Sequence, residues 1–261
     1  MRKYLFVFAL FIPFFMHAQK DRELELNIVF VGNSITQGAL LQHPEQEAPP
    51  VQTRLWLEKQ VGIADVNIFN QGVSGMPTVD FLPANKTLFT KLKAAMETLK
   101  AEYPKGSLVF SIMLGTNDSA NFGPTGAPIS ASQYYTNMKA IVDELLELFP
   151  SALFVLHRPI WYSPNTYNGA QYLASGLKRL DGYFLQLQEL VSHYAEKFPK
   201  RVFMGDEEAF TYFEVHHQTD LIPEEGLAGI FYLHPNSKGA EKLAAYWGKA
   251  IYHVIKSKLN N

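Results

Sequence analysis

The sequence has 261 residues, which is enough for one large hydrophobic core and not clearly enough for two domains. Hydrophobic residues make up 47% of it and charged residues 18%, which indicates a folded chain rather than a disordered one. The formal net charge of -2, without a dominant basic patch, argues against nucleic acid as a partner, and the absence of cysteine excludes disulfides, thiolate metal sites and a cysteine nucleophile.

The chain begins with a segment typical of a secretory signal. Two basic residues precede the apolar run Tyr4–Met16, and Ala18 ends a small-residue cleavage site. The run is short for a membrane span and is interrupted by Pro13. We therefore expect a signal peptide at residues 1–18, cut near Ala18, and a single domain at residues 19–261. The mature protein, with a net charge of about -4, would be secreted or periplasmic without a stable membrane anchor; an uncleaved anchor is the alternative.

Beyond this segment, short apolar runs alternate with longer amphipathic stretches. The runs predict strands at Asn27–Val31, Val66–Asn70, Leu108–Leu114, Leu153–His157 and Val202–Met204. The stretches predict helices at Val51–Val61, Leu88–Glu102, Ala131–Phe149, Tyr172–Phe198 and Ser237–Leu259. The segments expected to be irregular are Gln42–Pro50, Asn121–Pro128, Ser163–Gly169 and Phe210–Leu233. This alternation predicts one α/β domain with a central, mostly parallel, five-stranded sheet.

Three of the predicted strands are followed at once by polar or glycine-rich clusters. The clusters are Gly32-Asn33-Ser34, Asn70-Gln71-Gly72-Val73-Ser74-Gly75 and Gly115-Thr116-Asn117-Asp118. Ligands of parallel sheets bind at the carboxyl ends of strands, where these clusters would lie. Ser34 could be a nucleophile or an ordinary helix N-cap. The main-chain N–H of Gly75 and the amide of Asn117 could hydrogen-bond a developing oxyanion, or both could belong to ordinary turns.

A fourth cluster carries His234, just before the last predicted helix. A lone histidine is more often structural, but at this junction it could accept a proton from a serine. His157, at the end of a predicted strand, is a second candidate. His216 and His217 have no third ligand at a convincing spacing, so we expect no metal site.

The four clusters, in this order, resemble the sequence blocks of the SGNH hydrolases, also called the GDSL family. The family's G-D-S block is matched by Gly32-Asn33-Ser34, its N-x-G-x-S-G block by Asn70 to Gly75, and its G-x-N-D block by Gly115 to Asp118. The histidine of its D-x-x-H block, which is followed by P-N, is matched by His234. The resemblance implies a three-layer, flavodoxin-like α/β fold and a serine ester hydrolase.

The resemblance also implies roles for these residues. Ser34 would be the nucleophile and His234 the general base. The N–H groups of Ser34 and Gly75 and the side chain of Asn117 would form the oxyanion hole. No metal or organic cofactor would be needed.

Two residues depart from the family's pattern. Asn33 replaces the Asp of the first block, with little expected effect on the chemistry. Phe231 stands where the family has the Asp that orients the histidine. Another carboxylate could substitute for it, and the candidates are Glu225, which we favour slightly, Glu224 and Asp206. Otherwise a main-chain carbonyl could hold the imidazole, or the site could be impaired.

The substrate is expected to be an acetylated or otherwise short-acylated carbohydrate. Trp161 and Tyr162, after the fourth predicted strand, could stack on sugar rings, although a packed aromatic loop is the alternative. No long apolar lid is evident, which favours saccharide over lipid esters. The alternatives are a lysophospholipase-like or general short-chain esterase, and a catalytically impaired carbohydrate-binding protein. No heptad pattern or large apolar stripe suggests an oligomer, so a monomer is expected.

Two other classes fit the sequence poorly. A phosphate or nucleotide binder would need G-x-x-x-x-G-K-[ST] or a proper G-x-G-x-x-G, and neither occurs. An α/β-hydrolase would need G-x-S-x-G, but Thr36 stands where its second glycine would be.

Overall fold

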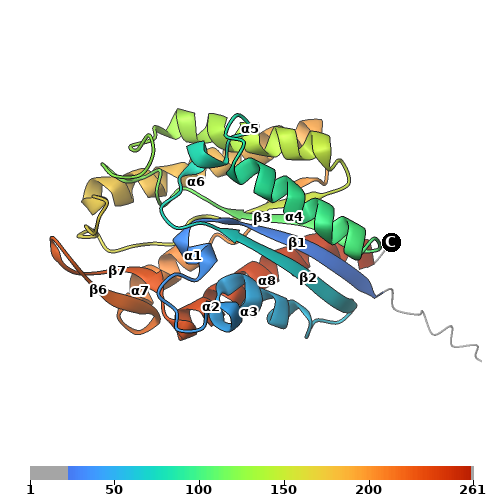
Figure 1. The fold of residues 1–261 in the computed structure, drawn as a ribbon, viewed down its shortest axis with the longest axis horizontal. Coiled ribbons are helices and arrows are strands. Elements are labelled where there is room, and N and C mark those ends of the chain that lie inside the picture. The colour runs from blue at the N-terminus through green and yellow to red at the C-terminus, as the bar shows by residue number, and fades with distance from the viewer. Residues whose placement is uncertain (1–22, 260–261) are drawn as a thin grey trace, which may run out of the picture.

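The computed structural model describes residues 23–259, so the expected signal peptide at residues 1–18 lies outside the described residues. The centre of the domain is a five-stranded sheet in the order β2-β1-β3-β4-β5 (Figure 1). Every neighbouring pair in this sheet is parallel. The strands are β1 (Leu24–Gly32), β2 (Ile63–Gly72), β3 (Ser107–Met113), β4 (Leu153–Leu156) and β5 (Val202–Met204).

Helices cover both faces of the sheet and make three layers (Figure 1). One layer holds α4 (Leu88–Glu102), α5 (Ala131–Leu148) and α6 (Leu173–Lys197). The other holds α2 (Pro44–Glu47), α3 (Pro49–Leu57), α7 (Ala209–Asp220) and α8 (Ser237–Leu259). The fold class inferred from the sequence is confirmed. None of the helices between residues 23 and 259 is both long and apolar enough to cross a membrane.

The inner strands are apolar because helices bury them from both sides. In β1, the residues from Leu26 to Gly32 are all buried. In β3, the residues from Leu108 to Met113 are buried as well. Burying one such side chain contributes about 1.5–3 kcal/mol, so a polar residue facing either helix layer would be costly. The continuous apolar runs that predicted parallel strands have this cause.

The largest difference from the sequence-based expectation lies in residues 210–233. This segment was expected to be irregular, but it contains most of α7 and an antiparallel hairpin of β6 (Leu221–Gly226) and β7 (Gly229–Pro235). In β6, Pro223 and two consecutive glutamates hide the strand alternation. In α7, only four of the residues are buried, too few to produce a clear helical stripe.

His157 is buried at the end of β4, where its ring bridges the sheet to the chain after β5. The Asp206 N–H donates to Nδ1 at 3.0 Å, so Nδ1 carries no proton. Nε2 therefore carries the proton and donates to the Ser111 hydroxyl at 2.9 Å. Burial lowers the pKa of His157 from its usual 6.5 to about 3, which keeps the ring neutral.

We predict that His157 makes the fold less stable in mild acid. The folded pKa lies below the unfolded value of 6.5, so the unfolded chain takes up a proton that the folded chain excludes as the pH falls below 6.5. His157→Gln keeps an acceptor for the Asp206 N–H but does not titrate. In urea unfolding at about pH 7.5 and about pH 5, the wild type should lose about 2 kcal/mol more stability than this variant.

The exposed His253 supplies the control. His253→Gln should lose stability between the two pH values as the wild type does. An equal loss in wild type and His157→Gln would show that His157 is not the group responsible.

Candidate active site

Ser34 lies at the turn from β1 into the short helix α1 (Ser34–Gln37). Asn33 is the N-cap of this helix, and its Oδ1 accepts the Ile35 N–H at 3.0 Å. Gly32 lets the turn close tightly, because a Cβ at this position would lie 2.0 Å from Thr36 Oγ1. The tight turn places the Ser34 side chain beside a cavity at the carboxyl end of the sheet.

His234 lies between Ser34 and a carboxylate. The Ser34 hydroxyl is 2.9 Å from His234 Nε2, and His234 Nδ1 is 2.8 Å from Glu224 Oε1. The main-chain N–H of His234 also donates to Glu224 Oε1 at 3.3 Å. The side chains of His234 and Glu224 are only 10% and 13% exposed, so water screens this pair little. A carboxylate at Nδ1 favours the tautomer whose Nε2 can accept the serine proton.

The carboxylate comes from the hairpin that the sequence analysis did not foresee. In the hairpin register Glu224 pairs with Phe231, the residue at the position of the family's Asp. Glu225, which we favoured slightly, is exposed and pairs with Ile230. Because successive residues of a strand point to opposite faces, Glu225 cannot share the direction of Glu224. The preference for Glu225 is therefore corrected in favour of Glu224.

Asp206, the third candidate, has a different structural task. Its carboxylate accepts the Glu208 N–H at 3.1 Å and the Ala209 N–H at 3.2 Å, which holds the backbone where α7 begins. Burial raises its pKa to about 6. Asp206 is thus engaged by the main chain of its own loop.

The cluster after β2 is tied to α1 by side-chain hydrogen bonds. Asn70 Nδ2 donates to the Thr36 carbonyl at 2.9 Å, and Asn70 Oδ1 accepts the Gly72 N–H at 2.9 Å. The N–H and the hydroxyl of Ser74 both donate to Gln37 Oε1, at 2.9 and 2.7 Å. These bonds place the next residue, Gly75, at the cavity that Ser34 also lines.

Gly75 has a φ of +78°, a left-handed conformation that glycine adopts without strain. Apart from Gly75 itself and its two chain neighbours, no residue has an atom within 4 Å of the position that its Cβ would take, so this side of its backbone faces open space. A ligand in the cavity can therefore approach the Gly75 backbone closely.

Asn117 is buried after β3 and its side chain is held at both ends. Its Nδ2 donates to the Met76 carbonyl at 3.2 Å, and its Oδ1 accepts the Tyr172 hydroxyl at 2.6 Å. The neighbouring Asp118 accepts the Thr78 N–H at 3.1 Å and also the Thr78 hydroxyl. Burial raises the pKa of Asp118 to about 6. Asp118 thereby holds the loop that contains Met76 against Asn117.

One cavity of about 500 Å³ brings the four clusters together. Ser34, Gly75, Asn117 and His234 all line it, and so does Glu224. The other lining residues are mostly small or polar and include Ser74, Gly123, Pro124, Asn168, Gly169, Ala170, Leu40 and Tyr172. Sequence analysis missed Tyr172, because a tyrosine at the start of a predicted helix has no motif spacing to distinguish it.

The two aromatic residues expected to bind sugar do not line this cavity. Tyr162 is fully buried, and its hydroxyl is 2.9 Å from the Ser119 hydroxyl. Trp161 is 6% exposed and packs against His217 at a ring distance of 5.0 Å. The β6–β7 hairpin covers this segment, and the Ser163 N–H donates to the Tyr232 carbonyl at 2.9 Å. The stacking role is therefore wrong, and the packed aromatic loop is the structure found.

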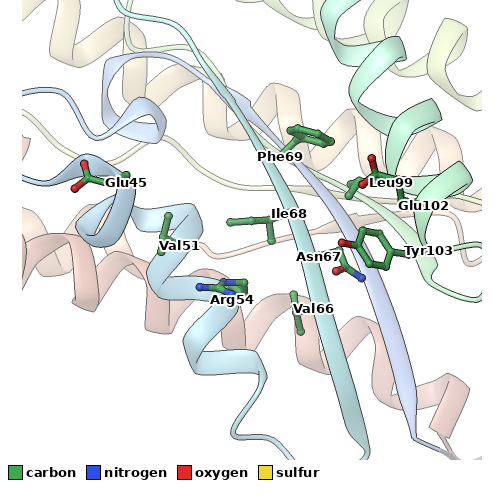
Figure 2. Close-up of a pocket in the computed structure, with 10 residues that line it drawn as sticks. All are labelled: Glu45, Val51, Arg54, Val66, Asn67, Ile68, Phe69, Leu99, Glu102 and Tyr103. Carbon is green, nitrogen blue, oxygen red and sulfur yellow. The ribbon is translucent and has the colours of Figure 1, made fainter.

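A second cavity, of about 370 Å³, lies along the edge strand β2 (Figure 2). Arg54 of α3 and Tyr103, just after α4, border it, together with Val66 and Ile68 of β2. None of its lining residues is a serine or a histidine. Among the described residues, no group of three or more His, Asp or Glu side chains is placed to hold a metal ion.

The fold is similar to several solved esterase structures. Est24, a carbohydrate acetylesterase from Sinorhizobium meliloti, gives a TM-score of 0.58 at 16% identity, covering 88% of this chain and 100% of that one. A lipase/acylhydrolase from Enterococcus faecalis gives 0.53 at 19% identity, covering 89% and 96%. A two-domain esterase active on acetylated mannans gives 0.54 at 17% identity, covering 92% of this chain and 52% of that one.

These identities are low, so the similarities establish a shared fold. No curated protein sequence matches the chain significantly. The model of the GDSL-like lipase/acylhydrolase family, however, matches residues 30–242, which include all four clusters. The chain therefore belongs to the GDSL-like lipase/acylhydrolase family and is a carboxylic ester hydrolase.

Proposed function

We propose that this protein is an exported serine esterase that removes acetyl or other short acyl groups from carbohydrates. The observation that carries the proposal is the series of contacts from Ser34 through His234 to Glu224, with distances of 2.9 and 2.8 Å. The base is within hydrogen-bonding distance of both the nucleophile and the orienting acid, and all three border one cavity. Export rests on the expected signal peptide at residues 1–18.

In the proposed acylation step, Ser34 Oγ attacks the ester carbonyl carbon and its proton moves to His234 Nε2. Glu224 holds the Nδ1–H and stabilises the imidazolium that forms. The tetrahedral oxyanion accepts hydrogen bonds from the N–H groups of Ser34 and Gly75 and from Asn117 Nδ2. The C–O bond to the alcohol then breaks, and His234 returns the proton to the leaving oxygen.

In the proposed deacylation step, water replaces the alcohol. His234 Nε2 takes a proton from the water, whose oxygen attacks the acyl carbon bound to Ser34. The second tetrahedral intermediate collapses, the acid leaves, and Ser34 recovers its proton from His234. The cycle uses only these side chains and main-chain N–H groups, and we propose no metal or organic cofactor.

The lining of the cavity supports a small acyl group and a polar alcohol. Glycine, alanine, serine and asparagine dominate its walls. Asn168 Oδ1 accepts the Ala170 N–H at 2.8 Å, which fixes an amide at the wall where a sugar hydroxyl could bind. Two proteins with the same fold are described as esterases of acetylated carbohydrates. We therefore propose an acetylated saccharide as substrate. We also propose a monomer as the working form, because the sequence shows no heptad pattern or large apolar stripe.

One residue favours a second candidate, a general short-chain esterase. Leu40 lines the cavity and is 58% exposed, so it could receive an apolar acyl chain longer than acetyl. The contact of Glu224 Oε1 with His234 Nδ1 supports a working enzyme rather than an impaired carbohydrate-binding protein.

We predict that purified protein hydrolyses p-nitrophenyl acetate faster than the butyrate ester and longer esters, because small residues border the reacting centre. Ser34→Ala should lower kcat at least about 10³-fold, since it removes the hydroxyl that contacts His234 Nε2. The same pair of proteins should then be compared for acetate release from acetylated mannan. Turnover that survives in Ser34→Ala would refute the serine mechanism, and a preference for longer esters would favour the second candidate.

We also predict that Glu224→Gln lowers kcat by about 10²–10⁴-fold. A glutamine amide can donate to Nδ1, which favours the tautomer with a proton on Nε2 and leaves Ser34 without a base. Glu225→Gln is the matched control, because it makes the same change one residue away on the opposite face of β6. Steady-state rates on p-nitrophenyl acetate check both variants. If Glu225→Gln were the slower of the two, the assignment of Glu224 would be wrong.

A further inference from the structure

Tyr172 is the one large side chain of the cavity that contacts Asn117 by a hydrogen bond. It lies just before α6, is 4% exposed, and donates its hydroxyl proton to Asn117 Oδ1 at 2.6 Å. We propose that Tyr172 is a positioning residue that holds the Asn117 amide with Nδ2 toward the reacting carbonyl. This inference rests on the proposed function, because it assigns Asn117 to the oxyanion hole.

The partners of Asn117 determine which way its amide points. The Met76 carbonyl, 3.2 Å away, can only accept a hydrogen bond, so the amide atom that faces it must be the donor Nδ2. Oδ1 then faces Tyr172, whose hydroxyl must donate. Nδ2 has two hydrogens and Met76 uses one of them. The second is free to donate to an oxyanion.

Without the Tyr172 hydroxyl, only one of these two bonds would remain. The amide could then rotate about its last side-chain bond, and Oδ1 would have no partner in a buried place. An oxyanion hole is effective because its donors are oriented before the charge develops. A donor that must first reorient contributes less to the transition state, while binding of the uncharged ester changes little.

The environment of Tyr172 keeps both its position and its proton. The Tyr172 N–H donates to the Thr166 carbonyl at 3.2 Å, and Asn121 Nδ2 donates to the Tyr172 carbonyl at 2.9 Å. Its ring packs edge-on against Tyr162 with the centroids 5.3 Å apart. Burial, with the negative charges of Glu224 and Asp118, raises the pKa of Tyr172 above its usual value, so the hydroxyl remains a donor at neutral pH.

The test is Tyr172→Phe, which removes one oxygen and keeps the ring. We expect kcat on p-nitrophenyl acetate to fall about tenfold or more, with KM within about twofold of wild type. Labelling of Ser34 by a fluorophosphonate, in which the serine oxygen bonds to phosphorus and fluoride leaves, should slow by a similar factor. Tyr183→Phe is the matched control, because it removes another buried tyrosine hydroxyl, this one on α6 and bonded to the Ile129 carbonyl at 2.5 Å. It should retain wild-type rates.

A double-mutant cycle separates positioning from general damage to the fold. In an Asn117→Ala background, Tyr172→Phe should change kcat by less than about twofold, because the amide that it orients is gone. A wild-type kcat in Tyr172→Phe, or the same loss with and without Asn117, would overturn the inference. If Tyr172→Phe fails in either of these ways while Ser34→Ala is inactive, only the role of Tyr172 is refuted and the serine esterase mechanism is retained. Turnover in Ser34→Ala would instead refute the proposed function.

Discussion

The proposed site depends on the parallel register of three neighbouring strands. Gly32 at the end of β1 lies beside Gly72 of β2 and Met113 of β3. The chain therefore leaves the sheet three times at one level, and Ser34, Gly75 and Asn117 follow within a few residues. A slip of one residue would move a strand end by about 3.3 Å and turn its side chains to the opposite face. Hydrogen-bond donors to an oxyanion must lie within about 2.7–3.1 Å, so the register of the sheet sets the geometry on which the chemistry depends.

Close backbone contact at Gly72 brings the end of β2 against α1. A Cβ at Gly72 would lie 2.2 Å from the Gln37 backbone nitrogen, so only glycine lets β2 pass directly under α1. Gln37 can then reach Ser74, whose N–H and hydroxyl it binds. Gly72 is thus the position where the end of β2 meets the helix that follows β1. The close packing of α1 on β2 is therefore also what places the proposed oxyanion donors.

The parts of the molecule that follow a strong physical pattern were predictable. Short apolar runs marked all five parallel strands, and the inner strands β1, β3 and β4 are buried between helices. Three motif clusters marked strand ends that line the cavity, and a fourth marked His234 before the last helix. The β6–β7 hairpin was not predictable, because its short, half-exposed strands interrupt their alternation with Pro223 and two glutamates. Without the hairpin, neither the choice of Glu224 over Glu225 nor the burial of Trp161 and Tyr162 could be foreseen. Contacts between segments far apart in sequence, such as Tyr172 with Asn117, leave no local pattern.

The position of Glu224 shows what the proposed chemistry requires of an orienting acid. His234 needs an anionic acceptor near Nδ1, and any strand that brings a carboxylate to that point satisfies the requirement. In the D-x-x-H motif the acid stands three residues before the histidine on the same strand. Here the proposed acid is Glu224, which comes from the paired strand β6 and lies opposite Phe231. Phe231 is 1% exposed, so the residue at the motif position contributes to the core instead. The departure from the motif is therefore consistent with an intact proton-transfer geometry. The chemistry requires a carboxylate oxygen near His234 Nδ1, and the spacing of the motif is one of several ways to place it there.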